Sequence, residues 1–380
     1  MPESYDVIIV GLGAMGSATA YHLARRGQRV LGLERFSAGH TRGSSHGESR
    51  IIREIYFEHP LYVPIVQRAY ELWQELEQES GTRLLTITGG LMIGPERGTL
   101  VSGVRRSAAE HRIAHEVLSA PEINARFSGF DVSDENVAIL DPRGGYLDAD
   151  ACVRTHLALA ERSGARLHFD EPVVSWTSDG KSVRIVTSRG RYEARQLVVS
   201  AGPWASTLFP DLELPLAVER QVLAWFEPST HAEWYDPSRF PIYLWEYAVG
   251  RLAYGFPRLA KGVKAAVFHE GDIVSDSDAI ARSVDPAEIQ RVRDALRSFL
   301  PGVASGALRD ATVCPFTNTP DTHFLIDVHP SFSNVLISSP CSGHGFKFAS
   351  AVGELQADLL VDGHARIDLS PFRLGRFQIR

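Results

Sequence analysis

A glycine-rich turn between two apolar runs opens the chain and strongly limits how it can fold. Residues 5–10 (YDVIIV) form a short run rich in β-branched residues, which is typical of a buried parallel strand. GLGAMG follows directly, then a stretch of helical composition at 17–26, and then RVLGLE, which predicts a second strand ending at Glu34. This order predicts the β-α-β unit of a dinucleotide-binding fold.

The spacing of the glycines has a physical reason. Gly11 permits the tight turn out of the strand, Gly13 lets the backbone approach a pyrophosphate, and Gly16 lets helix and strand pack closely. The helix N-terminus then offers free N–H groups to the phosphates. Glu34 stands where a carboxylate accepts hydrogen bonds from ribose hydroxyls, which disfavours the 2′-phosphate of NADP. An NAD-dependent dehydrogenase and a glycine turn without a ligand remain open at this point.

Beyond this unit, helical and strand patterns alternate. Aromatic and β-branched residues are frequent over 219–270, which predicts a mostly antiparallel sheet. The fold class is therefore α/β with mixed α+β character. Helices are predicted over 61–80, 151–162, 287–300 and 345–360, and strands within 84–94, 166–169, 182–188, 192–202, 324–328 and 335–339.

Composition excludes several classes of protein. Lys plus Arg number 39 against 46 Asp plus Glu, a net charge of -7, which argues against a nucleic-acid-binding protein. The cysteines are Cys152, Cys314 and Cys341, too far apart for a disulfide framework or a cysteine-rich metal site, and no metal is expected. The N-terminus does not resemble a signal peptide, and no apolar run reaches the ~20 residues of a membrane span. We expect a cytoplasmic protein that contacts neither membrane nor nucleic acid.

The segment HTRGSSHGESRIIR (40–53) is small, polar and basic. Its G-x-S-x-G pattern around Ser45 matches a hydrolase nucleophile elbow, but that motif needs a sharp strand-to-helix turn, and the preceding strand ends about ten residues earlier. The favoured interpretation is a loop along a phosphate and flavin edge. Ser44 and Ser45 would donate hydrogen bonds there, while Arg50 and Arg53 supply positive charge unless they form surface ion pairs.

Two further segments have the small residues that let a backbone approach a flat ligand. VVSAGPW (198–204) ends a predicted strand, although an ordinary strand-to-helix turn would look similar. SGHGFKF (342–348) precedes the last predicted helix, and Lys347 would be unfavourable for the helix dipole unless it faces an anion.

Six motifs together resemble the monomeric sarcosine oxidase and N-methyltryptophan oxidase family, within the D-amino-acid-oxidase-like flavoproteins. They are VIIVGLGAMGSATAYHLA, SHGESRIIR, VVSAGPW, YGFP, CPFTNTPD and SGHGFKF, and they extend from residue 7 to residue 348. The resemblance implies an FAD-dependent oxidase of secondary N-methyl amino acids, converting sarcosine, oxygen and water to glycine, formaldehyde and hydrogen peroxide. A bulkier N-methyl amino acid, a cyclic imino acid and a flavin dehydrogenase are the alternatives within the fold.

The resemblance also implies where FAD binds. The flavin would be attached through a thioether at Cys314, although a buried inert thiol is the commoner fate of a cysteine. The implied cofactor-binding residues are Gly11, Gly13, Ala14, Met15, Gly16, Glu34, Arg35, Ser44, Ser45, His46, Arg50, Val173, Ala201, Gly202, Trp204, Cys314, Gly343, His344, Gly345, Phe346 and Lys347.

On the substrate side, Arg53 and Lys347 match the cations that hold the substrate carboxylate, a task that suits charge-assisted hydrogen bonds. Lys264 matches the lysine that activates oxygen, and a cation there would stabilise superoxide-like charge. Arg50 is implied beside the flavin ring, and Tyr254 in the substrate cavity.

Two departures from the family concern the substrate. Phe316 stands where the family has a tyrosine, so a hydroxyl is lost. His269 matches a substrate-cavity histidine, but it lies five residues after Lys264, one more than in sarcosine oxidase. A bulge could absorb the extra residue; otherwise Lys261 or a shifted geometry is involved.

The predicted domains interleave along the chain. The FAD-binding domain, Rossmann-like, takes residues 1–80, 149–218 and 320–380, and the substrate domain takes 81–148 and 219–319. The expected partners are a small amino acid and oxygen, and the chain is expected to be a monomer.

Overall fold

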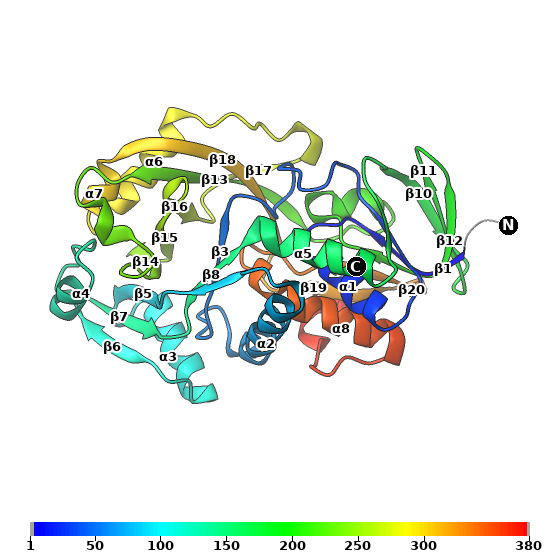
Figure 1. Ribbon diagram of the computed structural model, residues 1–380, viewed down its shortest axis with the longest axis horizontal. Helices are drawn as coiled ribbons and strands as arrows, with labels where there is room; N and C mark the ends of the chain where they lie inside the picture. The colour runs from blue at the N-terminus through cyan, green and yellow to red at the C-terminus, as the bar shows by residue number, and fades with distance from the viewer. Residues whose placement is uncertain (1–3, 378–380) are drawn as a thin grey trace.

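The computed structural model describes residues 4–377; the outermost residues of the predicted FAD-binding domain, 1–3 and 378–380, lie outside it. Figure 1 shows a sheet with its helices at each end of an elongated molecule, and β3 and β8 between them. This arrangement confirms the predicted mixed α/β class. The division into two interleaved domains stays a prediction.

The first sheet contains the N-terminal strand. β1 (Ser4–Val10) is buried from Tyr5 onward and pairs in parallel with β2 (Val30–Leu33) and β12 (Arg191–Val199). A strand buried on both faces has no polar alternation, which explains its continuous apolar run. The sheet order is β10-β11-β12-β1-β2-β9, with β20 beside β12 and β19 beside β20. The other strands are β9 (Arg166–His168), β10 (Val173–Ser178), β11 (Val183–Thr187), β19 (Leu325–His329) and β20 (Phe332–Ser339).

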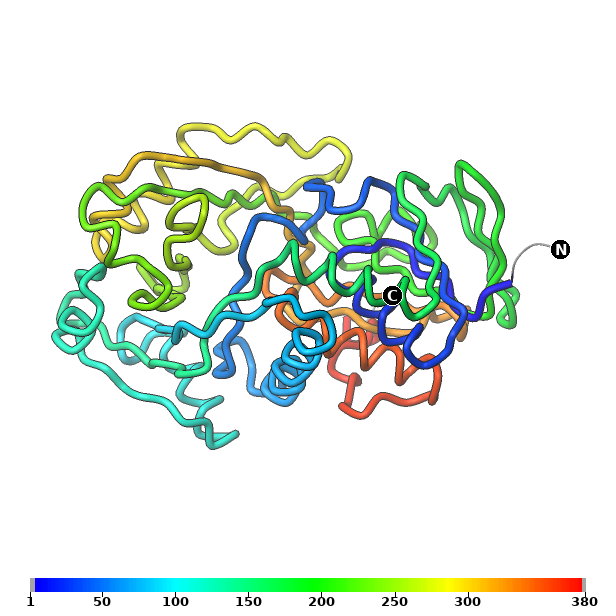
Figure 2. The backbone as a smooth tube through the Cα atoms, in the orientation of Figure 1, coloured from blue at the N-terminus to red at the C-terminus, as the bar shows by residue number. Residues whose placement is uncertain are grey.

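Helices from distant parts of the chain cover this sheet. α1 (Ala14–Arg25) packs against α5 (Ala149–Arg162) and α8 (Ala349–Asp362), and α2 (Val63–Ser80) packs against α8. A Cβ added to Gly353 would lie 2.6 Å from the Ala18 carbonyl carbon, so α8 needs glycine there to approach α1. Figure 2 follows the blue N-terminal and red C-terminal stretches of chain into the same half of the molecule.

The second sheet matches the predicted antiparallel region. Its order is β17-β13-β16-β15-β14-β5-β7-β6, with β18 beside β13, and the β14–β5 pair is parallel. The strands are β5 (Gly90–Pro95), β6 (Glu116–Ser119), β7 (Asn136–Asp141), β13 (Ala217–Glu227), β14 (Ile242–Ala248), β15 (Arg251–Leu259), β16 (Gly262–Phe268), β17 (Asp272–Val274) and β18 (Ala307–Asn318), and the helices beside them are α3 (Thr99–His111), α4 (Ala120–Arg126), α6 (Pro286–Leu296) and α7 (Pro301–Ala304).

A small sheet joins the two halves. β3 (Ser49–Ile52) and β4 (Leu85–Ile87) both pair antiparallel with β8 (Gly145–Asp148). β3 lies within the polar segment 40–53 noted in the sequence, so this sheet fixes where Arg50 and Arg53 lie. The 3₁₀ turns are Pro60–Tyr62, Gly202–Leu208, Ala232–Tyr235, Ser277–Ala279, Phe346–Phe348, Ser370–Phe372 and Leu374–Phe377.

Of the four predicted helices, all of which are shifted at an end, two differ most in their bounds. The helix expected over 287–300 ends at Leu296, and the chain turns before Pro301 starts α7. The helix expected from residue 345 begins at Ala349, because a 3₁₀ turn holds Phe346–Phe348 first. Lys347 therefore lies just before the helix. Within residues 4–377, no helix combines the length and apolar character needed to cross a membrane.

Candidate active site

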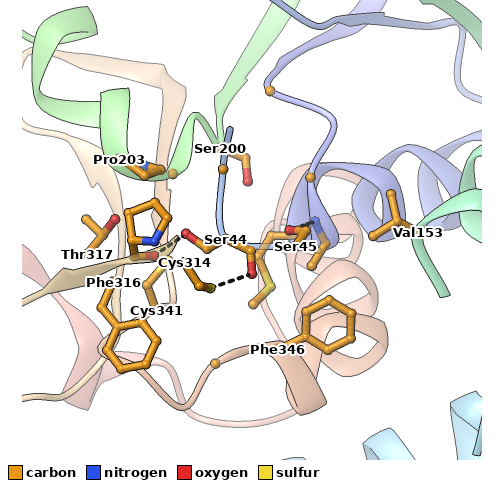
Figure 3. A pocket seen from close by; sticks show the side chains of 18 of the residues that line it. Ser44, Ser45, Val153, Ser200, Pro203, Cys314, Phe316, Thr317, Cys341 and Phe346 are labelled. Atoms are coloured by element: carbon orange, nitrogen blue, oxygen red, sulfur yellow. Dashed lines mark hydrogen bonds between the residues drawn. The ribbon is translucent and has the colours of Figure 1, made fainter. Parts of the chain in front are cut away.

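A cavity of about 490 Å³ brings the separate motifs together. Its lining comes from the glycine turn, the loop before β3, the start of the 202–208 turn, β18 and the 340–347 segment. Figure 3 shows Ser44, Ser45 and Ser200 near Cys314, with the Phe316 and Phe346 rings on opposite sides of the view.

The glycine turn is shaped as the sequence predicted. Gly11 has a φ of +91°, and a Cβ there would lie 2.4 Å from the Ser200 carbonyl oxygen. A Cβ at Gly16 would lie 1.9 Å from the Gly11 oxygen, so α1 and β1 can pack only with glycine at this position. Gly13 is the N-cap of helix α1 and has no side chain to cap it, and the first helical residues, Ala14 and Met15, line the cavity. Apart from that of Ala14, which donates to Ser45, the N–H groups at this end suit the phosphates of FAD.

Glu34 lines the cavity beside the turn. Its carboxylate accepts hydrogen bonds from the backbone N–H of Leu12 (2.8 Å) and Phe36 (3.0 Å). Burial alone would raise the pKa of Glu34, but hydrogen bonds from His40, Leu12 and Phe36 lower it overall. The residue is therefore an anion, able to accept a ribose hydroxyl. The N–H groups at the start of α1 can donate to phosphates, and the Glu34 carboxylate can accept from a ribose hydroxyl, so the residues of this wall fit FAD.

The loop before β3 closes against the glycine turn. Ser45 Oγ accepts a hydrogen bond from the Ala14 N–H at 3.0 Å, and Ser44 Oγ donates to the Pro315 carbonyl at 2.5 Å. The chain continues from this loop into strand β3, so the strand-to-helix turn of a hydrolase elbow is missing here. His46 is buried behind the loop; burial, followed by Arg50, lowers its pKa to about 3 and keeps it neutral.

Arg50 lies against the Cys314 thiol. Its guanidinium donates to the carbonyls of Ser44 (2.9 Å) and His46 (2.6 Å), and it is 3.3 Å from Cys314 Sγ. Figure 3 marks the contact between that thiol and the Ser44 carbonyl, 3.8 Å long. A cation beside a sulfur stabilises developing thiolate charge.

Two cations are buried at another part of the cavity wall. Arg53 is 2% exposed, and its Nη2 donates to both carboxylate oxygens of Glu58 at 2.7 and 2.6 Å. Lys347 is 5% exposed and donates to the Tyr56 hydroxyl at 3.2 Å and the His344 carbonyl at 2.7 Å. Burial, reinforced by Arg53, lowers the pKa of Lys347 to about 7.

A chain of hydrogen bonds fixes the groups around Lys347. His344 Nε2 lies 2.9 Å from the Thr322 carbonyl, so this nitrogen must carry the proton. Nδ1 therefore accepts from the Tyr56 hydroxyl at 2.7 Å, and Tyr56 in turn accepts from Lys347. Burial lowers the pKa of His344 to about 3, which keeps the ring neutral.

Lys264 lies behind the loop that precedes β3. It is 1% exposed, donates to the carbonyls of Gly47 (2.8 Å) and Ser49, and lies 4.1 Å from the centre of the Phe256 ring. Burial, followed by the charge of Arg50, holds its pKa well below the usual value.

The extra residue between Lys264 and His269 has a structural outcome. β16 extends to Phe268, and its pairing with β15 is regular from Ala265 onward. Because successive side chains alternate between the two faces of a strand, Phe268 lies on the same face as Lys264. His269 then takes a left-handed conformation (φ 57°) and pairs with Glu219 at 2.9 Å. Phe268, and not His269, lines the cavity together with Tyr254.

Most of the predicted site residues line the same cavity. Gly16, His46, Lys264 and His269 do not; the first three lie behind its wall, and His269 lines a neighbouring cavity. Tyr56, Glu58 and Phe268 were not predicted from the sequence. The first two lie within five residues after SHGESRIIR, and that proximity was the available signal. The predicted residues on the lining are Gly11, Gly13, Ala14, Met15, Glu34, Arg35, Ser44, Ser45, Arg50, Arg53, Val173, Ala201, Gly202, Trp204, Tyr254, Cys314, Phe316, Gly343, His344, Gly345, Phe346 and Lys347.

Comparison with known proteins agrees with this geometry. Residues 6–359 match the family described as FAD dependent oxidoreductase. The chain is 44% identical to a monomeric sarcosine oxidase of Streptomyces avermitilis, over 96% of this chain and 95% of the relative. It is 34% identical to an N-methyl-L-tryptophan oxidase of Yersinia pestis, over 98% of this chain and all of the relative.

Solved structures show the same fold. NikD, an unusual amino acid oxidase essential for nikkomycin biosynthesis, superposes with a TM-score of 0.84 at 27% identity, over 98% of this chain and 97% of NikD. L-proline dehydrogenase from P. horikoshii superposes with a TM-score of 0.86 at 20% identity, over all of this chain and 99% of the dehydrogenase. The family match overturns the NAD-dependent dehydrogenase that the glycine turn had left open.

Proposed function

The chain belongs to the FAD dependent oxidoreductase family, together with the monomeric sarcosine oxidases, and on that premise we propose that it oxidises secondary N-methyl amino acids, sarcosine first. Sarcosine, oxygen and water would give glycine, formaldehyde and hydrogen peroxide. The substrate loses two electrons and a proton from its N–CH₃ group and a second proton from its nitrogen. The resulting imine takes up water and splits into glycine and formaldehyde, and oxygen receives the two electrons and two protons to give hydrogen peroxide.

The pair of buried cations is the observation that carries this proposal. Arg53 and Lys347 both line the cavity, and neither has more than 5% of its surface exposed. Buried charges are costly without a partner, and Glu58 is a single carboxylate for two cations. A substrate carboxylate would supply the second anion. Charge-assisted bonds to both cations would fix its orientation.

The protein's part in the chemistry is orientation, exclusion of water and charge. Bound FAD would supply the two-electron acceptor and the route to oxygen. Arg53 and Lys347 would hold the carboxylate end, which is a proximity effect. Tyr254, Phe268 and Phe316 form an aromatic wall that keeps water out. Lys264, buried next to the loop, would stabilise negative charge that develops on oxygen.

We also propose that the flavin is attached through Cys314. This thiol lies on the cavity wall, in contact with Arg50 Nη2 at 3.3 Å. A monomer in the cytoplasm is proposed as well, on the name of the Streptomyces relative and on the three unpaired cysteines. Light scattering on the purified protein tests the first of these, and fractionation of the source cells the second.

Anaerobic addition of sarcosine to the yellow protein, followed by air, is the direct test. We expect the visible flavin band to bleach and then to return with release of hydrogen peroxide. Arg53→Ala and Lys347→Ala should raise the sarcosine concentration needed more than they slow reduction at saturation. Unchanged kinetics in both variants would remove these residues from the site.

The same assay separates the alternatives. Bleaching only with N-methyl-L-tryptophan or with a cyclic imino acid would keep the cofactor and change the substrate. Bleaching that air does not reverse would indicate a flavin dehydrogenase. A yellow protein that no N-methyl or cyclic amino acid bleaches would overturn the proposed function.

A further inference from the structure

A second, smaller cavity of about 180 Å³ adjoins the main one. Thr99, Gly250 and Thr322 are exposed at its edge, so it opens to solvent. The two cavities share four lining residues, which form the partition between them: Glu58, Leu252, Phe268 and His344.

Two of the four partition residues are held by polar contacts. Glu58 is bound through both oxygens to Arg53. His344 is held at both ring nitrogens, by Tyr56 and by the Thr322 carbonyl. Neither side chain can move aside without leaving a buried polar group unpaired.

The other two partition residues, Leu252 and Phe268, are apolar. They face each other in the β15–β16 ladder, where packing alone positions their side chains. Phe268 is the larger and packs edge-on against Tyr254 (6.0 Å between ring centres) and Phe316 (5.9 Å). A Cβ on Gly343 would lie 3.0 Å from the Phe268 ring, so the ring also abuts the 340–345 segment.

The partition lies within reach of the proposed carboxylate site. Glu58 belongs to it and is 2.6 Å from Arg53. A substrate whose carboxylate binds Arg53 and Lys347 therefore has its α-carbon close to this wall. Any α-substituent that extends toward the wall meets the Phe268 ring before it reaches the second cavity.

We infer that Phe268 is a specificity-determining residue, whose ring leaves room at the substrate's α-carbon for little more than the hydrogen atoms that sarcosine carries there. This inference rests on the proposed function and adds its substrate class: N-methyl amino acids with no side chain or a very small one. Shortening residue 268 would join the two cavities and admit larger apolar side chains.

The test compares sarcosine with N-methyl-L-phenylalanine in flavin-loaded enzyme, as the ratio of the two kcat/KM values. Phe268→Ala should raise the N-methyl-L-phenylalanine to sarcosine ratio at least about tenfold, the scale of discrimination that a hydrophobic pocket provides. Phe268→Leu, which retains more of the packing, should raise it less. Adding Thr99→Trp to Phe268→Ala should reverse the gain, because Thr99 lines only the second cavity.

Phe332→Ala is the matched control, since Phe332 packs against Trp176 and His329 and lines neither cavity. Its ratio should equal that of the parent. If sarcosine reduces the flavin in every variant but neither Phe268 variant changes the ratio, the inference is wrong and the proposed function stands. A parent enzyme that already oxidises both substrates equally well would also overturn it. If no N-methyl amino acid reduces the flavin, both are overturned.

Discussion

Arg53 and Glu58 form a two-point ion pair in which one guanidinium nitrogen serves both carboxylate oxygens, at 2.7 and 2.6 Å. Arg53 is buried and the Glu58 side chain is 10% exposed, and the Arg53 cation lowers the pKa of Glu58 although burial opposes that shift. Glu58 thus already neutralises one of the two cavity cations, and its negative charge competes with a substrate carboxylate for their attraction without having to leave Arg53.

We expect Glu58→Gln to lower the dissociation constant of acetate, a substrate analogue without the amine, by about tenfold. The change removes the competing anion and leaves Arg53 and Lys347 in need of one. Acetate should also raise the thermal midpoint of the variant more than that of the parent. Perturbation of the flavin spectrum measures binding, and Glu71→Gln, at an exposed ion pair with Arg68, is the control. Weaker acetate binding in Glu58→Gln would contradict the competition.

Lys347 should make carboxylate binding depend on pH. Burial and Arg53 lower its pKa to about 7, so the free enzyme loses this positive charge as the pH rises through about 7. Acetate affinity should therefore fall above that pH, and Lys347→Met should bind weakly with no such fall. The stability of the folded protein should change with pH in the opposite direction to acetate affinity. The unfolded lysine keeps its proton to a higher pH, so this group favours folding more as the pH rises above 7.

The two cavity cysteines should behave differently. We expect acid-precipitated parent protein and Cys341→Ala to stay yellow, whereas Cys314→Ala should release its flavin into the supernatant. Both thiols line the cavity, but the Arg50 contact belongs to Cys314. Absorbance of the pellet and the supernatant measures where the flavin is. A colourless parent pellet would contradict covalent attachment, and a colourless Cys341→Ala pellet would place the attachment at Cys341.

Lys264→Met should slow the return of the flavin band in air by about a hundredfold or more, the usual cost of losing one group that stabilises developing charge. Anaerobic reduction by sarcosine should change far less. Lys261→Met is the matched control because Lys261 is exposed and pairs with Asp310. Stopped-flow mixing of reduced enzyme with oxygen gives the rate; equal rates for parent and Lys264→Met would exclude the role.

Local patterns predicted much of this site, because strand, glycine turn and helix are encoded by neighbouring residues. Gly11 and Gly16 need no distant partner to be recognised. The Arg53–Glu58 ion pair could not be predicted in that way, since either residue could equally have formed a surface contact. The placement of Phe268 depended on the register of β16 against β15, which pairs Phe268 with Leu252 and which the local sequence does not reveal.

The close contact of α8 with α1 sets a condition on synthesis. The helix proposed to receive the phosphates is made well before its partner, because Gly353, which packs on Ala18, comes more than three hundred residues later in the chain. β20, which completes the centre of the first sheet beside β12, is also made late. We therefore expect the nucleotide site of the nascent chain to stay unfinished until β20 and α8 have been translated. A truncation before α8 would lose FAD binding even though every residue of the glycine turn is intact.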